Sequence, residues 1–255
     1  PEEDLIRVGW VLQGLLFRAD ILTKHHLLHH ANLHDVLSRF FRYAFANFDA
    51  TGSERLLQQV IHIATNLVSG CDEAACAATH DPSSTTGSRS LLALIYGLFV
   101  SRAVSPALSR SAALYLAAAA RFSDPLAAIL KRQWLSDLPR VLSGGASGTH
   151  SRDTSRVSGA LLFLANLSLQ PPAAAAMART PALLDAMLAA GEESRDPDVS
   201  RYLFATLRHM ALGSENKSAL LVKSHDLRTH ERTKQHTQTH TDRHTDRQTT
   251  HTHAQ

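Results

Sequence analysis

The amino-acid sequence predicts an all-α fold: an armadillo- or HEAT-like stack of helix pairs over residues 1–223, followed by a disordered tail over 224–255. Three observations predict it. Apolar residues recur at helical spacing, and Ala and Leu dominate the composition. No stretch shows the period-two alternation that is typical of a half-buried strand. A similar helix end returns after about 52, 48 and 42 residues, near the period of such repeats.

The first half of the chain is predicted to form helices separated by turns. Thr51-Gly52-Ser53-Glu54 is a turn that can cap the following helix, and Gly70 ends that helix. A polar loop rich in Pro, Ser and Thr covers about 80–89. The predicted helices are 3–16, 21–34, 35–48, 55–69 and 72–79.

In the second half, prolines mark several helix boundaries. Asp124-Pro125 begins a short helix, Pro171-Pro172 ends a longer one, and Pro181 stands where a first helical turn tolerates it. A loop rich in Gly and Ser covers about 143–156. The predicted helices are 91–102, 106–122, 124–132, 134–142, 157–169, 173–179, 181–191 and one that follows Pro197.

The apolar positions of these helices predict a core between the repeats. Trp134 is expected to be an anchor of that core, because a large aromatic ring buries much apolar area. The leucines and isoleucine expected to be buried are Leu57, Ile61, Leu114, Leu116, Leu161, Leu164, Leu203 and Leu207.

When the similar helix ends of the four repeats are aligned, Asn66, Ala118, Asn166 and Arg208 occupy the same position. In armadillo proteins, an asparagine on the inner helix can clamp the backbone of an extended peptide. Asn66, Asn166 and Arg208 are therefore the candidates for a partner-binding groove. Ala118 and Arg208 interrupt the asparagine ladder, and no Trp accompanies either Asn, which favours a structural or capping role instead.

Composition excludes several classes of function. The chain carries 26 basic and 23 acidic residues that form no basic stripe, so no nucleic acid is expected as a partner. No apolar run reaches the roughly 18 residues of a membrane span, and no signal peptide is visible. Cys71 and Cys76 stand five residues apart on one predicted helix, a poor geometry for a disulfide, which favours a cytoplasmic location. Pro1 at the start suggests a fragment of a longer protein.

Five histidines, His25, His26, His29, His30 and His34, form the cluster that most resembles a metal site. Their i, i+4 pairs have the spacing of metal ligands on a helix. No acidic residue stands between the paired histidines and no third ligand is evident, so a solvated helix face is the preferred interpretation. No catalytic, cofactor-binding or metal-binding residue is predicted, and the glycines at 144–148 are interpreted as a linker because neither a strand nor a Lys flanks them.

The tail has a different composition from the rest. It consists almost wholly of His, Thr, Asp, Arg and Gln, and residues 240–247 repeat the tetrapeptide His-Thr-Asp-Arg. Such a segment lacks the apolar surface that would offset its chain entropy. Two interpretations stay open: a metal-binding His-rich tract, or a translated CA-rich microsatellite, in which case the authentic C-terminus is missing after about Lys223 or Ser224.

Two stretches together resemble the C-terminal armadillo-like region of the rotatin family, over about residues 56–223. One runs from Ser90-Leu91-Leu92-Ala93-Leu94 through 107–122 to Ile129-Leu130-Lys131-Arg132-Gln133-Trp134-Leu135, and the other from 159–169 through Leu183-Leu184 and 199–207 to Asn216-Lys217-Ser218-Ala219-Leu220-Leu221. The resemblance implies a scaffold at the centrosome and ciliary basal body, in centriole assembly and cilium maintenance, with protein partners, no enzymatic activity and no cofactor.

Three functional hypotheses follow. The first is a non-catalytic helical-repeat scaffold, centriolar by its resemblance to rotatin. The alternative is a generic armadillo adaptor that binds a linear peptide in its groove, against which the interrupted asparagine ladder argues. The third is a metal-dependent enzyme that uses the cluster between His25 and His34, against which the missing third ligand argues.

Overall fold

The computed structural model describes residues 2–51, 54–80, 90–143 and 154–213, and over these residues it is helical with no strand, which confirms the all-α prediction. Most of the loops predicted at about 80–89 and 143–156, and the whole tail over 224–255, lie outside the described residues. The helices are α1 (Glu2–Arg18), α2 (Ile21–His29), α3 (Leu33–Thr51), α4 (Arg55–Val68), α5 (Asp72–Ala77), α6 (Leu91–Val100), α7 (Pro106–Ala119), α8 (Ser123–Lys131), the 3-10 helix η1 (Trp134–Ser136), α9 (Leu138–Leu142), α10 (Thr154–Leu167), α11 (Pro171–Ala178), α12 (Pro181–Glu193) and α13 (Pro197–Leu212).

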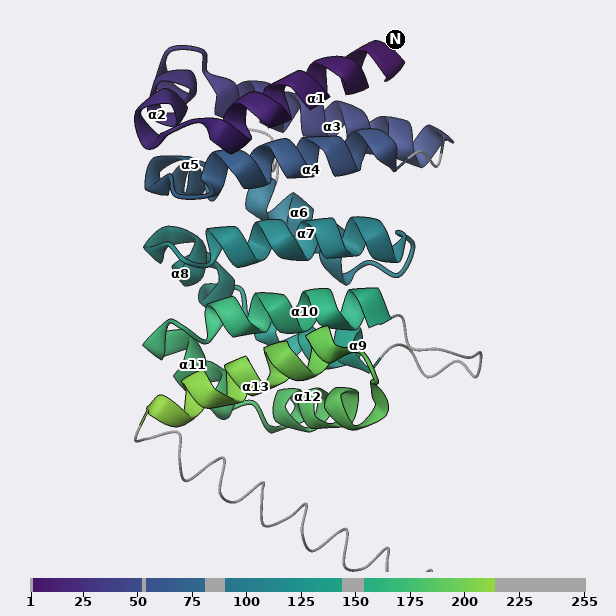
Figure 1. Cartoon of the computed structure of the whole chain (residues 1–255), viewed down its shortest axis with the longest axis vertical. Helices are drawn as coiled ribbons and strands as arrows, with labels where there is room; N and C mark the ends of the chain where they lie inside the picture. Colours follow the sequence, from purple (N-terminus) through teal and green to yellow (C-terminus); the bar gives the residue numbers. More distant parts are fainter. Residues whose placement is uncertain (1, 52–53, 81–89, 144–153, 214–255) are drawn as a thin grey trace, which may run out of the picture.

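The helices are arranged in layers along the long axis of the molecule (Figure 1). The long helices α1, α4, α7, α10 and α13 follow one another on the face that is turned to the viewer, and each contacts the next. The other helices pack behind them and at one side, with the long α3 against α4, and the shorter α6 and α9 against α7 and α10. Segments about 50 residues apart in the sequence therefore become neighbours in space.

Local signals in the sequence explain where many helices begin. Asp20, Ser90, Ser105 and Asp196 precede α2, α6, α7 and α13, and each side chain accepts a hydrogen bond from a backbone N–H of the first turn. Proline stands in the first turn of several helices, where its missing N–H has no intrahelical partner to lose. These prolines are Pro106, Pro139, Pro171, Pro181 and Pro197.

Three predicted boundaries are wrong. The segment 21–34 is two helices, because Asn32 adopts a left-handed backbone (φ 48°) that ends any regular helix and that asparagine tolerates. The segment 134–142 is likewise divided into η1 and α9, with Gln133 left-handed before it (φ 54°). The Gly- and Ser-rich loop ends earlier than predicted, since α10 begins at Thr154.

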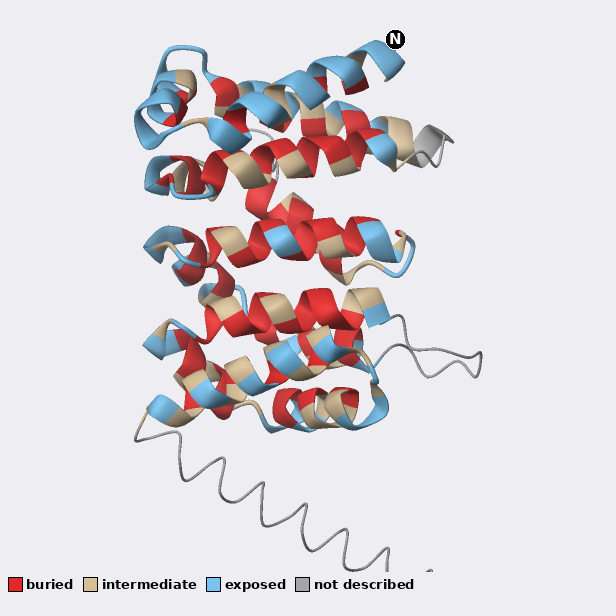
Figure 2. Ribbon diagram, viewed as in Figure 1, coloured by how far each residue is buried: buried red, intermediate tan, exposed pale blue. Residues whose placement is uncertain are grey.

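The core runs continuously through the layers (Figure 2). Six of the eight predicted core residues are buried: Leu57, Ile61, Leu116, Leu161, Leu164 and Leu203. Leu207 is half-buried, and the prediction for Leu114 is wrong because this side chain is 39% exposed on α7. Trp134 is buried as predicted, and its ring stacks on that of Tyr96, with 3.9 Å between the ring centroids.

Two polar contacts tie neighbouring layers together. The buried Lys24 of α2 donates from Nζ to the carbonyl oxygen of Ser69, 2.7 Å away, at the C-terminal end of α4 where a cation is favoured. The turn predicted to cap α4 ends at Glu54, whose carboxylate makes no capping hydrogen bond to that helix, while residues 52–53 of the turn lie outside the described residues. The Glu54 carboxylate accepts hydrogen bonds from the backbone N–H (2.6 Å) and the hydroxyl of Ser105, at the start of α7. The residue expected to end a turn instead joins two layers.

Within the described residues, no single helix combines the length and apolar composition needed to cross a membrane. The consecutive helices α7 and α8 reach both only when they are taken together, across a bend of 118°.

Candidate functional site

The face formed by α1, α4, α7, α10 and α13 is the candidate functional site, because these helices carry the predicted groove residues. Polar side chains join its successive helices. Gln59 of α4 donates to Gln13 of α1 (2.8 Å), and His62 of α4 lies 3.0 Å from the Ser111 hydroxyl of α7. Burial lowers the pKa of His62, so at neutral pH the ring is the neutral partner of this contact.

The three predicted groove residues lie on this face but do not form one cluster. Asn66 and Asn166 stand near the C-terminal ends of α4 and α10, which α7 separates. Arg208 is exposed on α13, next to α10. The Asn66 amide donates to the carbonyl oxygen of Gln13 (3.2 Å) and the Asn166 amide to that of Leu162 (3.0 Å). Each asparagine therefore already makes an internal hydrogen bond, and Asn66 joins α4 to α1.

A row of mostly apolar side chains runs across the same face. One helical turn before Asn66, Ala118, Asn166 and Arg208 stand His62, Leu114, Leu162 and Phe204, and Trp10 of α1 lines a pocket together with His62. We call these five residues the outward row. Trp10, Leu114 and Phe204 are 62%, 39% and 70% exposed, and the other two are half-buried. The outward row places one apolar side chain each on α1, α7, α10 and α13, and His62 on α4.

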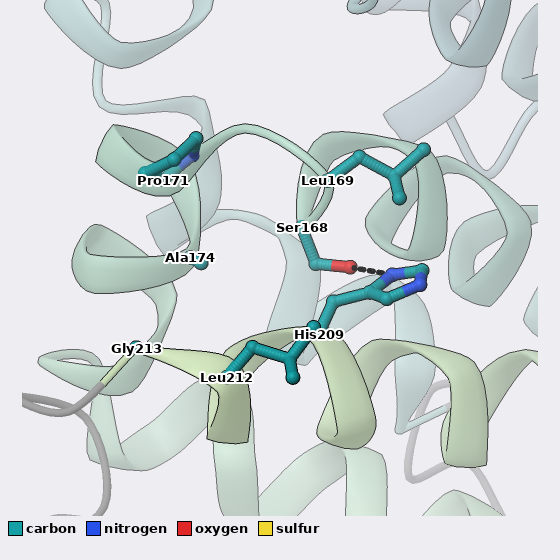
Figure 3. Close-up of a pocket in the computed structure, with 7 residues that line it drawn as sticks. All are labelled: Ser168, Leu169, Pro171, Ala174, His209, Leu212 and Gly213. Atoms are coloured by element: carbon teal, nitrogen blue, oxygen red, sulfur yellow. Dashed lines mark hydrogen bonds between the residues drawn. The ribbon is translucent and has the colours of Figure 1, made fainter.

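A second pocket lies where the ends of α10 and α13 meet (Figure 3). It has a volume of about 280 Å³ and is lined by Ser168, Leu169, Pro171, Ala174, His209, Leu212 and Gly213. The Ser168 hydroxyl lies 3.0 Å from Nδ1 of His209, and the two side chains point toward each other across the pocket.

The contact between Ser168 and His209 does not have the geometry of an activated nucleophile. Ser168 is only 3% exposed, and its hydroxyl also lies 2.8 Å from the carbonyl oxygen of Ala165. A hydroxyl can donate only one hydrogen bond. Ser168 can donate it to the closer carbonyl oxygen of Ala165, while Nδ1–H of His209 donates to the Ser168 hydroxyl oxygen. In that arrangement the imidazole does not act as a base toward Ser168. The pair instead joins α10 to α13.

The two cysteines are free thiols, with Cys71 buried and Cys76 partly exposed. The Cys76 thiol donates to the Asp124 carboxylate (2.8 Å) across the contact between α5 and α8. This hydrogen bond, together with burial and the negative charges of Asp124 and Asp72, raises the pKa of Cys76 to about 11. A thiol with so high a pKa is almost fully protonated at neutral pH and is a poor nucleophile.

The histidine cluster is divided between two helices. His25, His26 and His29 lie on α2, His30 ends that helix, and His34 lies on α3. The structure adds a residue that the spacing of the histidines could not indicate. Glu73, in the first turn of α5, places a carboxylate oxygen 3.0 Å from Nε2 of His25 and 2.9 Å from Nε2 of His29.

No family model matches the chain, and no curated protein matches it at a significant level. The outward row and the carboxylate of Glu73 are the features of the site that the sequence interpretation missed. The outward row could have been found from the sequence, because four of its residues stand four positions before the aligned helix ends. No pattern in the sequence around Glu73 indicates that it lies next to α2.

Proposed function

We propose that this chain is a non-catalytic helical-repeat scaffold that binds other proteins, and that it acts, as its resemblance to rotatin implies, in centriole and basal-body assembly and in cilium maintenance. In this interpretation the layers form an armadillo- or HEAT-like solenoid. Its neighbouring repeats bury a shared core and leave one extended face for partners. The order of α1, α4, α7, α10 and α13 along the long axis supports it.

The outward row is the observation that carries the proposal. Exposed apolar residues that recur along one face favour a surface for interaction over singly scattered ones. Here Trp10, Leu114 and Phe204 stand on α1, α7 and α13, every second helix of the face, with the two half-buried residues of the row on the helices between them. Aromatic residues such as Trp10 and Phe204 often dominate binding energy at protein interfaces. The protonated Cys76 thiol on α5 and the buried Ser168 at the end of α10 are poor nucleophiles, which favours binding over catalysis.

The internal contacts of the asparagines count against the alternative, a generic armadillo adaptor that clamps a peptide backbone. A clamp needs amide groups directed at the peptide, and Asn66 and Asn166 each use one N–H in a bond within the chain, which orients the side chain toward its own helices. Arg208 is exposed and available to a partner. The proposed scaffold therefore uses apolar anchors of the outward row rather than an asparagine ladder.

Depletion of the protein from ciliated cells tests the proposal. We expect fewer ciliated cells and impaired centriole maturation, with nuclear import unchanged, and we expect re-expression of the wild-type protein to restore cilia. Unchanged nuclear import separates the scaffold from a transport adaptor. Normal cilia after full depletion would contradict the centriolar role, and a metal-dependent hydrolytic activity lost in a His26→Ala/His30→Ala variant would contradict the non-catalytic one.

A further inference from the structure

We propose that His25, His29 and Glu73 form a Zn²⁺ site that clamps α2 to α5, a property independent of the proposed scaffold function. The three residues come from helices that contact each other, and Glu73 lies 44 residues after His29 in the sequence. One ligand atom from each residue lies within 4.8 Å of the other two. This is the only such group of three or more His, Cys, Asp or Glu residues within the described parts of the chain.

The local fold directs all three side chains to one point. His25 and His29 are one turn apart on α2, so their rings lie on the same face, with 4.4 Å between the ring centroids. The neighbouring Lys24 is buried and bonded to the carbonyl oxygen of Ser69, which fixes α2 against the end of α4. Glu73 extends from the start of α5, two residues after the buried Cys71. The helix backbones on both sides of the site are thus held by packed neighbours.

The distances between the ligand atoms suit a small cation. Zn²⁺ binds imidazole nitrogen at about 2.0–2.1 Å and carboxylate oxygen at about 2.0–2.2 Å, so tetrahedral ligands lie about 3.4 Å apart. The Glu73 oxygen lies 3.0 Å from His25 and 2.9 Å from His29, and all three residues are exposed. The carboxylate oxygen and the two ring nitrogens would have to move apart by a few tenths of an ångström to admit the ion. Exposed side chains can move that far by small rotations.

The donor set determines which ion is expected. Two imidazole nitrogens and one carboxylate oxygen, without a thiolate, match zinc sites with three protein ligands, in which water occupies the fourth position. The hydrogen bond from His29, followed by the charges of His25 and His29, lowers the pKa of Glu73, so the carboxylate is ionised at neutral pH. On binding, Zn²⁺ would replace the contacts between the two imidazole rings and the Glu73 carboxylate by metal–ligand bonds to both ring nitrogens and to the carboxylate oxygen.

The chain contains a matched control on the same helix. His26 and His30 are also one turn apart, and their ring centroids are likewise separated by 4.4 Å. Among the residues that the structure describes, no His, Cys, Asp or Glu completes a three-ligand group with this pair. Glu73 lies beside His25 and His29 but not beside His26 and His30. Comparing the two pairs therefore separates the contribution of the carboxylate from that of the histidine spacing.

The test is titration of the full-length, metal-free chain with Zn²⁺, measuring both the affinity and the shift of the thermal unfolding midpoint. The variants are Glu73→Gln, His25→Ala/His29→Ala and His26→Ala/His30→Ala, and all keep the histidines of residues 224–255. We expect the first two to lower the highest-affinity Zn²⁺ binding at least tenfold and to abolish its stabilising shift. The His26/His30 variant should stay within about twofold of wild type.

Equal Zn²⁺ affinity and equal midpoint shifts in wild type and Glu73→Gln would overturn the proposal. The same holds if the His26/His30 variant loses as much as the His25/His29 variant, because the carboxylate would then play no part. Circular dichroism of each metal-free variant checks that its helix content is unchanged. All the substituted side chains lie on the surface or at a helix end, so folding should persist.

Discussion

We expect Leu164→Ala to lower the free energy of unfolding by about 2–5 kcal/mol, a large part of the total stability of a typical domain. Leu164 is fully buried on α10, which packs against α7 on one side and α13 on the other. The substitution removes three carbon atoms from a position where rigid neighbours leave little room for collapse, so a cavity remains. Chemical denaturation followed by circular dichroism measures the loss.

Leu114→Ala is the matched control, because it makes the same chemical change on the neighbouring helix α7. Leu114 is 39% exposed, so part of its side chain stays in water when the protein folds and its removal leaves no enclosed cavity, and we expect a smaller cost of about 1 kcal/mol. Equal losses at the two positions would show that Leu164 does not pack between layers as the structure describes.

The second large effect is expected at Gly159, where α10 packs closely against α7. A Cβ added there would lie 3.2 Å from Cβ of Ala113 and 3.4 Å from the backbone Cα of Arg110, and neither atom can rotate away. Gly159→Leu must therefore push two helices apart. We expect destabilisation of about 1–3 kcal/mol, in spite of the gain of about 1 kcal/mol in helix propensity, and thermal unfolding measures it.

Gly14→Leu serves as the control for the glycine substitution. Gly14 lies within α1, is exposed, and has no atom within 4 Å of an added Cβ. The same substitution should therefore be neutral or raise stability by up to about 1 kcal/mol through helix propensity alone. A Gly159→Leu variant as stable as wild type would contradict the close approach of α7 and α10.

Much of the fold could be predicted because its signals are local. Caps such as Ser90 and Ser105, and prolines such as Pro106 and Pro197, mark helix starts within one turn of sequence. Burial was harder to predict where a helix is apolar all round. In α7 every residue from Ala112 to Ala119 is apolar or aromatic, so periodicity alone could not identify Leu114 as the exposed one among them.

The missed parts of the site depend on contacts between distant segments. The clamp of Glu73 on His25 and His29 exists only because α5 packs against α2, and no spacing rule connects residues in different helices. The division of 21–34 depends on the left-handed Asn32, whose conformation is one of several that asparagine tolerates. The aligned helix ends place Asn66 and Asn166 near the C-terminal ends of their helices, where the structure has them, whereas the partners of their amides could not be predicted.

Recruitment of the tagged protein to centrioles in ciliated cells tests the binding role of the outward row most directly. The test variant is Trp10→Ser/Leu114→Ser/Phe204→Ser, and the control is Val36→Ser/Tyr43→Ser, which removes exposed apolar groups from α3 outside the row. We predict that wild type and control concentrate at centrioles, while the row variant loses at least about fivefold of that signal although circular dichroism shows that it is still folded. Centriolar signal equal to wild type in the row variant, or its absence in the wild type, would contradict the account.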